Sequence, residues 1–401
     1  MTSSPDASEV GAARLSRARR ATRIEFAVLG MFAGTWGAHI PSVKAHFGLD
    51  EARLGWVLLA AAVGAVGALL IAGRAVERLG TRNAALAAGC AVALSLAAML
   101  QMPGLLTLLP VAFVLGAGTS LFDVAINSEG SELEILSQRA IMSNLHAMFS
   151  VGGMLGAGLV ALLLRLGIAP ALQLALIALA LASVVIVGTR GMLERRVHGA
   201  SDAPASFIWP RGALLLIGLL ILAGMMAEGV MYDWCVLYLK QELGMAPAPA
   251  VLGYAAFSAS MALARFCGDP LRQRYPEQRL LLVGGAMAGL AMAAVLLLRN
   301  PTVAIIGFAL VGAGLAPVAP ILYNAATRVP GVGRAAAIAS VTAIGYGGFM
   351  IGPPLIGGLA HATSLTAALV VVVAGAALLA FAARPVMALV PAPAPAPSSG
   401  P

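Results

Sequence analysis

The chain has 401 residues, of which 60% are hydrophobic and only 10% are charged, and its formal net charge is +8. Soluble domains carry about 25% charged residues, so this composition excludes a water-exposed globular protein and predicts a membrane protein. The basic balance does not indicate nucleic acid as a partner, because the Arg residues lie in short caps between apolar segments. The three cysteines, Cys90, Cys235 and Cys267, lie far apart in apolar runs, and we interpret them as buried thiols without disulfides or metal.

The apolar segments predict an all-helical protein that crosses the membrane twelve times. A spanning helix needs about 20 mostly apolar residues, and the strand alternation of an outer-membrane barrel is absent. The first segment follows an Arg-rich stretch, as in a signal peptide, but its apolar run is longer than a signal core, so we favour a retained span over a cleaved signal. The predicted spans lie near 24–42, 54–73, 83–101, 105–127, 140–164, 168–188, 212–237, 250–268, 278–298, 302–325, 335–360 and 364–384.

The basic residues are distributed unevenly between the two sides of the predicted membrane. If the N-terminus is placed inside, 20 of the 25 Lys and Arg residues lie inside, and the outside segments hold only Lys44, Arg53, Arg165, Lys240 and Arg299. The positive-inside rule therefore predicts a multi-pass protein of the cytoplasmic (inner) membrane with both termini in the cytoplasm.

The two halves of the chain resemble each other. "GAG" at 116–118 recurs at 312–314, and "GRAVERLG" at 73–80 aligns with "DPLRQRYP" at 269–276, both at an offset of 196 residues. Six spans separate the copies, so the halves have the same sidedness, which is the plan of an alternating-access carrier. We predict a cytoplasmic basic tail, an N-terminal six-helix bundle, a cytoplasmic linker, a C-terminal six-helix bundle and a disordered Pro/Ala tail, at 1–23, 24–188, 189–211, 212–384 and 385–401.

The segment between the second and third spans, "GRAVERLGTR" (73–82), resembles the loop signature of the major facilitator superfamily (MFS), G-x-x-x-D-R-x-G-x-R. Gly73, Arg78, Gly80 and Arg82 match this pattern, and Glu77 stands where Asp is usual. The resemblance implies that these residues form a cytoplasmic gate, which the acidic residue and the Arg hold closed through charge and helix-end contacts.

Three further segments are similar to the branch of that family named for the rhizopine transporter MosC. They are "DVAINSEGSELE" (123–134), "MSNLHAMFSVGG" (142–153) and "AEGVMYDW" (227–234). This similarity implies a sugar- or inositol-like substrate. The family resemblance also implies that spans one, four, seven and ten line a central cavity, with spans two, five, eight and eleven beside them, while spans three, six, nine and twelve face lipid.

The polar residues of the predicted spans fall on the helices that this plan assigns to the cavity. An ionisable residue at the centre of a membrane costs roughly 2.5 to 3.5 kcal/mol on insertion scales and is functional by default. We interpret Asp123, Glu228 and His146 as candidates for proton coupling, because such groups beside water change protonation as access alternates. A hydrogen-bonded structural role is the alternative for Asp123, which we expect in the cytoplasmic third of its span, and for His146.

A second set of polar and aromatic residues provides candidate substrate contacts. For Asn127 the alternative to substrate binding is a hydrogen bond to the helix neighbours of Asp123. For Asp233 and Trp234 the alternative is a solvated helix cap with an aromatic ring at the membrane interface. The candidates are Trp36, His39, Asn127, Asn144, Tyr232, Asp233, Trp234, Tyr323, Asn324 and Tyr346.

The remaining acids have plainer interpretations. We expect Glu25 to form a salt bridge at the inner surface, and Glu129, Glu132 and Glu134 to lie on a solvated helix end. No Lys or Arg is expected in the cavity, which argues against an anionic substrate.

These observations predict a secondary transporter that moves a small polar solute by alternating access, coupled to protons. It is expected to act as a monomer in the lipid bilayer without a cofactor. No Walker A sequence is present, so ATP drive within this chain is unsupported, and no catalytic or metal-binding constellation indicates an enzyme. A drug or metabolite efflux transporter is the first alternative, which an aromatic- and Met-rich cavity with few hydrogen-bonding groups would favour. A transporter-like membrane sensor without net flux is the alternative of another class.

Overall fold

The computed structural model describes residues 11–137, 141–193 and 208–391, and every regular element in these ranges is a helix. The predicted all-α fold class is therefore confirmed. Helices follow from the composition, because a lipid-facing segment has to satisfy each backbone N–H and C=O internally. Most of the predicted linker, residues 194–207, falls outside the described residues, as do the first and last ten residues of the chain.

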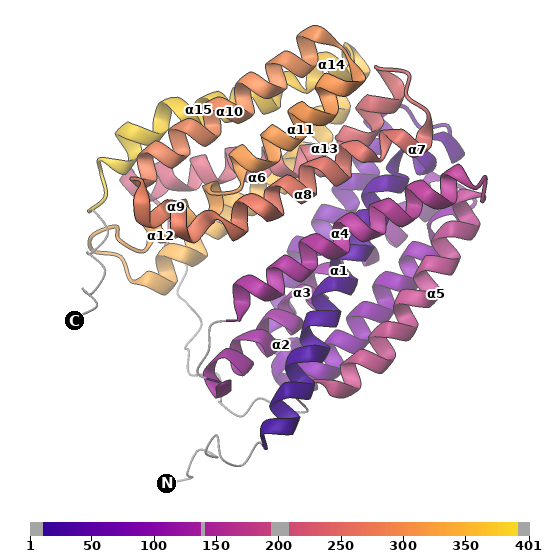
Figure 1. The fold of residues 1–401 in the computed structure, drawn as a ribbon, viewed down its shortest axis with the longest axis horizontal. Coiled ribbons are helices and arrows are strands. Elements are labelled where there is room, and N and C mark those ends of the chain that lie inside the picture. The colour runs from indigo at the N-terminus through magenta and orange to yellow at the C-terminus, as the bar shows by residue number, and fades with distance from the viewer. Residues whose placement is uncertain (1–10, 138–140, 194–207, 392–401) are drawn as a thin grey trace.

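The N-terminal half forms one bundle of long helices (Figure 1). Helix α1 begins within the predicted basic tail, at Ala12, and extends to His46. The other elements of this bundle are α2 (Glu51–Ala98), η1 (Met99–Gln101), α3 (Leu105–Ser137), α4 (Met142–Arg165), α5 (Pro170–Gly188) and η2 (Thr189–Gly191).

The C-terminal half forms the second bundle (Figure 1). Its last helix continues past the predicted boundary at 384 to Met387. The elements are α6 (Gly212–Gln241), α7 (Pro247–Ala250), α8 (Leu252–Phe266), α9 (Gly268–Arg274), α10 (Glu277–Leu298), α11 (Pro301–Leu315), α12 (Val318–Ala326), α13 (Arg334–Ala362), α14 (Leu365–Ala368) and α15 (Val370–Met387).

Ten helical stretches of the described chain are long and apolar enough to cross a membrane. Helix α2 is counted once among them, although it contains two predicted spans. Its backbone leaves helical geometry at Gly80, where φ is 78° and ψ is 158°; a positive φ strains any residue with a Cβ. Separating α2 at this position and adding the more polar α1 gives the twelve predicted spans.

Within the N-terminal bundle, small residues let helices touch along their backbones. A Cβ at Gly30 or Gly34 of α1 would collide with backbone atoms of Phe149 or Gly153 on α4, and one at Gly152 would collide with Ala27 of α1. Such small-residue contacts replace the hydrophobic driving force that is missing between helices in lipid. They hold α1 and α4 together as one unit.

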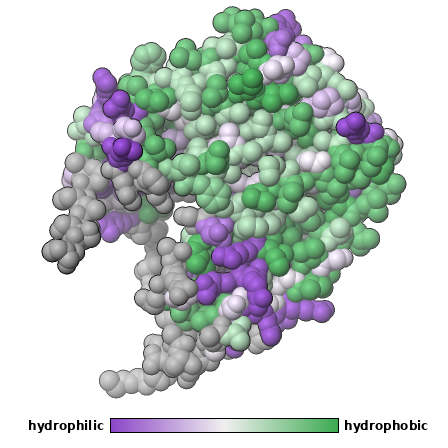
Figure 2. Space-filling model, viewed as in Figure 1, coloured by the Kyte–Doolittle hydropathy of each residue, from purple (hydrophilic) through white to green (hydrophobic). Residues whose placement is uncertain are grey.

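The two bundles approach each other at one end of the molecule and diverge at the other (Figure 1). We call the end that carries the start of α1 and the end of α15 the terminal end, and the end that carries α7 and α14 the distal end. Near the distal end, Gly55 of α2 packs on Pro353 and Gly357 of α13. Toward the terminal end the surface between the bundles is hollowed (Figure 2), so the protein adopts a state that is open at the terminal end.

The chain segments that flank residues 194–207 are each anchored to a bundle. The backbone N–H of Leu193 donates to a carboxylate oxygen of Glu129 on α3 at 2.6 Å. The hydroxyl of Ser340 on α13 donates to the carbonyl oxygen of Ile208 at 2.7 Å. The described chain therefore leaves one bundle and enters the other at fixed points.

Candidate substrate and proton site

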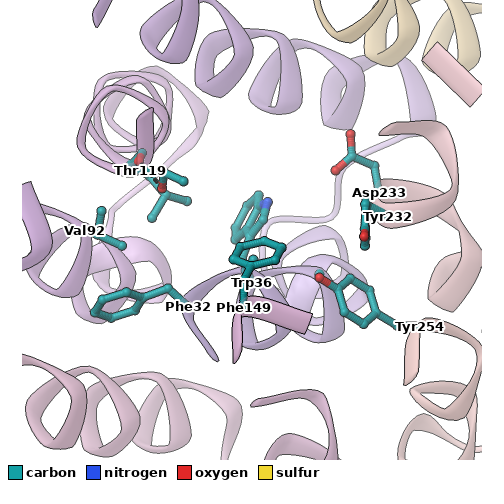
Figure 3. A pocket seen from close by; sticks show the side chains of 11 residues that line it. Phe32, Trp36, Val92, Thr119, Phe149, Tyr232, Asp233 and Tyr254 are labelled. Carbon is teal, nitrogen blue, oxygen red and sulfur yellow. Dashed lines mark hydrogen bonds between the residues drawn. The ribbon is translucent and has the colours of Figure 1, made fainter. Parts of the chain in front are cut away.

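A pocket of about 200 Å³ lies between the two bundles (Figure 3). It takes residues from α1, α2, α3 and α4 of the first bundle and from α6 and α8 of the second. Its lining consists of Phe32, Ala33, Trp36, Gly37, Val92, Leu115, Thr119, Phe149, Tyr232, Asp233 and Tyr254. Because both bundles contribute, any ligand held here contacts the two parts of the protein that an alternating-access carrier moves.

Aromatic rings form much of the pocket wall. Trp36 and Phe149 lie at its centre, and Tyr254 faces them from the second bundle (Figure 3). The rings of Tyr232 and Tyr254 are 5.4 Å apart, and an edge-on contact of 5.0 Å fixes Tyr232 against Phe257. Gly37 of α1 admits Tyr254, because a Cβ there would overlap its ring.

Asp233 supplies the carboxylate of this pocket. Its side chain is half-buried, lines the pocket and projects into the open space between the helices (Figure 3). No hydrogen bond or ion pair engages it within the described chain. The interpretation of Asp233 as a solvated cap therefore does not describe its surroundings. A carboxylate turned into a ligand-sized cavity without a protein partner is available to a bound solute.

Glu228, one of the predicted proton-coupling residues, is paired. Its carboxylate lies 3.1 Å from a guanidinium nitrogen of Arg265, and the second carboxylate oxygen lies 3.4 Å from the same nitrogen. The pair joins α6 to α8, with 17% of the Glu228 side chain and 38% of the Arg265 side chain exposed. The expectation of a cavity without Lys or Arg is therefore wrong. Arg265 lies close to the end of its predicted span, where a basic residue is typical of a loop cap.

Arg265 also lines a cleft of about 540 Å³ between α4 of the first bundle and α8 and α12 of the second. His146 and Ser150 line the facing wall, and Tyr323 lies on α12. The His146 ring makes an edge-on contact with Phe26 at 5.4 Å. The predicted proton-coupling residue His146 thus faces the same cleft as the Glu228–Arg265 pair.

The side chains of Asp123 and Asn127 are hydrogen-bonded to each other on α3. The Asn127 amide donates to the Asp123 carboxylate at 2.9 Å and to the Asp123 backbone carbonyl at 2.9 Å. Helix α3 continues to Ser137, beyond the predicted end at 127. Asp123 therefore lies about 27 Å from one end of the helix and about 21 Å from the other, and its place in the cytoplasmic third of the membrane span remains a prediction.

Two predicted substrate contacts are buried inside a bundle instead. His39 has no exposed surface, and its ring nitrogen Nδ1 lies 3.3 Å from the Ser42 hydroxyl. Trp234 is also fully buried, whereas its neighbour Asp233 lines the pocket. Consecutive residues of a helix point about 100° apart, so these two side chains cannot share one face.

Of the remaining predicted contacts, Tyr323 lines the cleft, and Tyr346, Asn324 and Asn144 are not among its lining residues. Tyr323 is half-buried, with its hydroxyl 3.9 Å from the Met225 sulfur. Tyr346 is half-buried beside Phe349 at a ring distance of 6.3 Å. Asn324, on α12, accepts a hydrogen bond from Arg328 at 3.3 Å, and Asn144 is exposed near the start of α4.

The predicted gate residues lie at the terminal end. Glu77 and Arg78 are exposed, as is Gly73, while Arg82 is half-buried. The contacts of α2 with Pro353 and Gly357 lie at the distal end, far along the helix from Glu77. A gate at Glu77 and Arg78 remains a prediction for the state in which the terminal end closes.

The acids after Asn127 are not a solvated helix end. Glu129 is 1% exposed and accepts hydrogen bonds from the Thr81 hydroxyl and the Leu193 N–H, both at 2.6 Å. Glu132 is buried as well. Glu134 accepts hydrogen bonds from the backbone N–H groups of Ile141 and Met142, which satisfies the start of α4. Glu129 thus connects α3, the start of the third span and the segment after α5, a role that sequence spacing did not signal.

Glu25 also differs from the expectation. It is fully buried, and neither carboxylate oxygen has a hydrogen-bond partner in the described chain. One of these oxygens lies in close contact with Gly188 on α5. The predicted salt bridge is therefore wrong: Arg14, Arg17, Arg20 and Arg23 of α1 are exposed, and Glu25 faces inward.

The sequence is similar to those of known membrane transporters. Residues 24–333 match the sequence profile of the Major Facilitator Superfamily. An uncharacterized MFS-type transporter of Yersinia pestis is 35% identical over 86% of this chain and 90% of its own length. The membrane protein MosC of Rhizobium meliloti is 26% identical over 90% of this chain and 88% of its own length.

Solved transporters share the architecture. A mutant of the nucleoside transporter NupG superimposes with a TM-score of 0.76 over 93% of this chain and 99% of its own, at 13% identity. A D-xylose-proton symporter gives a TM-score of 0.73 over 93% and 97%, at 13% identity. A bacterial homolog of the human lysosomal transporter Spinster, solved in an inward-facing and unoccupied conformation, gives 0.71 over 96% and 100%, at 15% identity. At these identities the similarity shows the fold.

Proposed function

Because the chain belongs to the Major Facilitator Superfamily and is a membrane transporter, we propose that it moves a small polar solute by alternating access, coupled to protons. One observation carries this proposal: helices α4, α6 and α8, which line a pocket built by both bundles, also carry the ion pair Glu228–Arg265 and a cleft that Arg265 and His146 line together. Charged groups within a membrane are costly and are kept where they serve a solute or ion pathway.

The ion pair offers a physical route to coupling. Proton uptake by Glu228 removes its negative charge and with it the attraction to Arg265, which is then free to take another partner. Loss of that proton on the other side of the membrane restores the pair. Because water reaches both side chains, we expect this pair to contribute about 1 kcal/mol or less, enough to bias a two-state equilibrium up to about fivefold.

Asp123 and His146 are further candidates for the proton path. Asp123 is held by Asn127 near the middle of α3, and His146 faces the cleft from α4. Both belong to the first bundle, whereas Glu228 and Arg265 belong to the second. A proton that travels between them would cross the interface that opens and closes.

The membrane orientation follows from charge. We propose that the terminal end faces the cytoplasm, since 20 of the 25 basic residues fall on that side of the predicted spans. In this orientation the protein resides in the cytoplasmic membrane and its cleft opens inward. The domain boundaries of the sequence, with a basic tail, two bundles and a linker, fit the same arrangement.

The relatives favour a hydroxyl-bearing solute. The neighbours in structure include a nucleoside transporter, a D-xylose-proton symporter and a fucose:proton symporter. The expectation of an inositol-like solute depends on the similarity to MosC. We therefore include sugars and inositols in the first panel of candidates.

Efflux of a drug or metabolite is the second candidate function. The pocket favours it, because five of its eleven lining residues are aromatic and few of the others offer hydrogen bonds. Polyspecific binders use such adaptable apolar surfaces. The direction of flux in intact vesicles separates export from uptake.

The test is transport by purified protein in liposomes that contain a pH-sensitive dye. We expect a gradient of the transported solute to change the internal pH, and Glu228→Gln to abolish this change while solute exchange at equal concentrations continues. Glu242→Gln, which removes an acid at the distal end of the same segment, is the matched control. Solute flux with no pH change in the native protein would overturn the coupling, and binding without flux would favour a sensor.

A further inference from the structure

We propose that the pocket between the bundles binds a compact organic cation, with the Asp233 carboxylate as its counter-charge and the rings of Trp36, Tyr232 and Tyr254 as its walls. This inference rests on the proposed transport function and narrows the polar solute to one that carries a protonated amine or a quaternary ammonium group. It identifies a chemical class that neither the family nor the relatives' names specify.

The first argument is charge. Asp233 lines the pocket without a hydrogen-bond or ion-pair partner in the described chain, and its carboxylate projects into the open space (Figure 3). The lining contains no Lys, Arg or His. Arg265, on the second bundle, is already paired with Glu228 at 3.1 Å. In its ionised form, Asp233 gives the pocket one uncompensated negative charge, which a cationic ligand would neutralise.

The second argument is the aromatic wall. A cation is attracted to the face of an aromatic ring, most strongly to Trp, and cages of such rings are the usual recognition device for ammonium groups. Trp36 comes from the first bundle, and Tyr232 and Tyr254 from the second, with their rings 5.4 Å apart. A cation between them would contact both bundles at once.

The third argument is a shortage of hydrogen-bonding groups for a neutral polyol. The Thr119 hydroxyl already donates to the Leu115 carbonyl at 2.8 Å, and the Tyr232 hydroxyl lies 3.7 Å from the Met261 sulfur. Apart from the Asp233 carboxylate and the polar groups of Trp36 and Tyr254, the lining offers the several hydroxyl groups of a sugar few partners in exchange for the water that they lose, which opposes binding. A cation needs only the carboxylate and the rings.

The test compares matched pairs of ligands that differ in charge. Choline and its neutral isostere 3,3-dimethylbutan-1-ol form one pair, and glucosamine and glucose form the other. Binding is measured by calorimetry on the full-length protein in lipid nanodiscs. We expect the charged member of at least one pair to bind about tenfold more tightly or better, and we expect Asp233→Asn to remove this preference.

Further variants distinguish the contribution of the charge to binding from that of the aromatic rings and from any effect on folding. Trp36→Leu should weaken cation binding about three- to thirtyfold, while Glu242→Gln, an acid outside the pocket, should leave the preference unchanged. The thermal unfolding temperature of each variant is compared with that of the native protein, and Asp233→Glu should retain the preference if the charge is what matters.

Equal affinity within both pairs, no binding of either cation at millimolar concentration, or a preference that survives Asp233→Asn would each overturn the inference. Its failure is distinct from failure of the proposed function. A protein that transports neutral solutes with protons and ignores choline would retain the function and lose the cation site. A protein that binds choline through Asp233 but changes no internal pH would retain the site and lose the coupling.

Discussion

The carboxylate of Glu228 and the guanidinium of Arg265 lie 3.1 Å apart on adjoining helices at the edge of the cleft. Arg265 lines the cleft, as does Arg272, which pairs with Glu277 at 3.7 Å, and Glu228–Arg265 has the more exposed side chains of the two pairs. In the proposed coupling, protonation of Glu228 removes its attraction to Arg265 and so alters the packing of α6 against α8.

The first prediction concerns this pair. Arg265→Gln leaves Glu228 in the cleft without its cation, and we expect solute-driven proton flux to fall about tenfold or more. Stability should fall by only about 1 kcal/mol or less, because water reaches both side chains. Proton flux and thermal unfolding are measured on Arg265→Gln, Glu228→Gln and the double variant. A double-mutant cycle without coupling between the two sites would contradict the interpretation.

The second prediction concerns Glu129. Glu129→Ala leaves the buried Leu193 N–H without its partner and leaves the Thr81 hydroxyl with only the Leu193 carbonyl at 3.5 Å, and we expect a loss of about 3 kcal/mol in the free energy of unfolding. Thr81→Val removes one of the two donors and should cost about 1 kcal/mol. Denaturation in mixed detergent micelles measures both changes.

Glu77→Gln is the matched control for Glu129, because Glu77 is an exposed acid in the neighbouring segment. Its effect on stability should stay within about 0.5 kcal/mol. If Glu129→Ala behaves like this control, the buried hydrogen bonds do not hold the end of the bundle together.

The third prediction tests the distal contact between the bundles. A Cβ at Gly357 would lie 2.6 Å from the Glu51 carbonyl oxygen, whereas one at Gly358 meets no atom within 4 Å. We expect Gly357→Ala to push the distal ends apart and to raise the fraction of molecules open at that end severalfold, and we expect Gly358→Ala to have no effect.

Spin labels at Ala45→Cys and Ala246→Cys, two exposed distal positions on different bundles, report the separation by electron resonance. The native cysteines are first replaced by Ala. Identical distance distributions for Gly357→Ala and Gly358→Ala would show that the glycine contact does not control this equilibrium.

The fourth prediction concerns Glu25. Its carboxyl group is fully buried and lacks a partner in the described chain, which costs stability relative to an apolar side chain of similar size. We expect Glu25→Met to raise the free energy of unfolding by about 1–3 kcal/mol. A variant that unfolds more readily than the native protein would show that the carboxyl group contributes to packing. If proton flux also fell in a stabilised variant, Glu25 would belong to the proton path.

The spans and their order could be predicted from the sequence because twenty apolar residues have few alternatives to a membrane helix. The break at Gly80 coincides with the loop that carries the family signature. Helix ends were predicted less well: α3 extends to Ser137, so Asp123 lies nearer mid-helix than the apolar run indicated. Polar residues past the apolar run, such as Glu129, still belong to the helix because they find partners inside the bundle.

The sequence did not predict which face of each helix points into the pocket. Helix α6 is apolar on every side, so its sequence does not reveal that Asp233 faces the pocket while Trp234 faces the core. Trp36 and His39 pose the same difficulty on α1, where one lines the pocket and the other is buried. Arg265 was missed because a basic residue at a span end resembles a loop cap. These assignments depend on contacts between residues far apart in the chain.

The two anchored positions on either side of residues 194–207 have a mechanical consequence. Leu193 is fixed to the first bundle through Glu129, and Ile208 is fixed to the second through Ser340. Fifteen residue steps separate these points, a contour of at most about 50 Å. Any rocking of the bundles therefore changes the separation of Leu193 and Ile208, and the covalent chain caps that separation at this contour length.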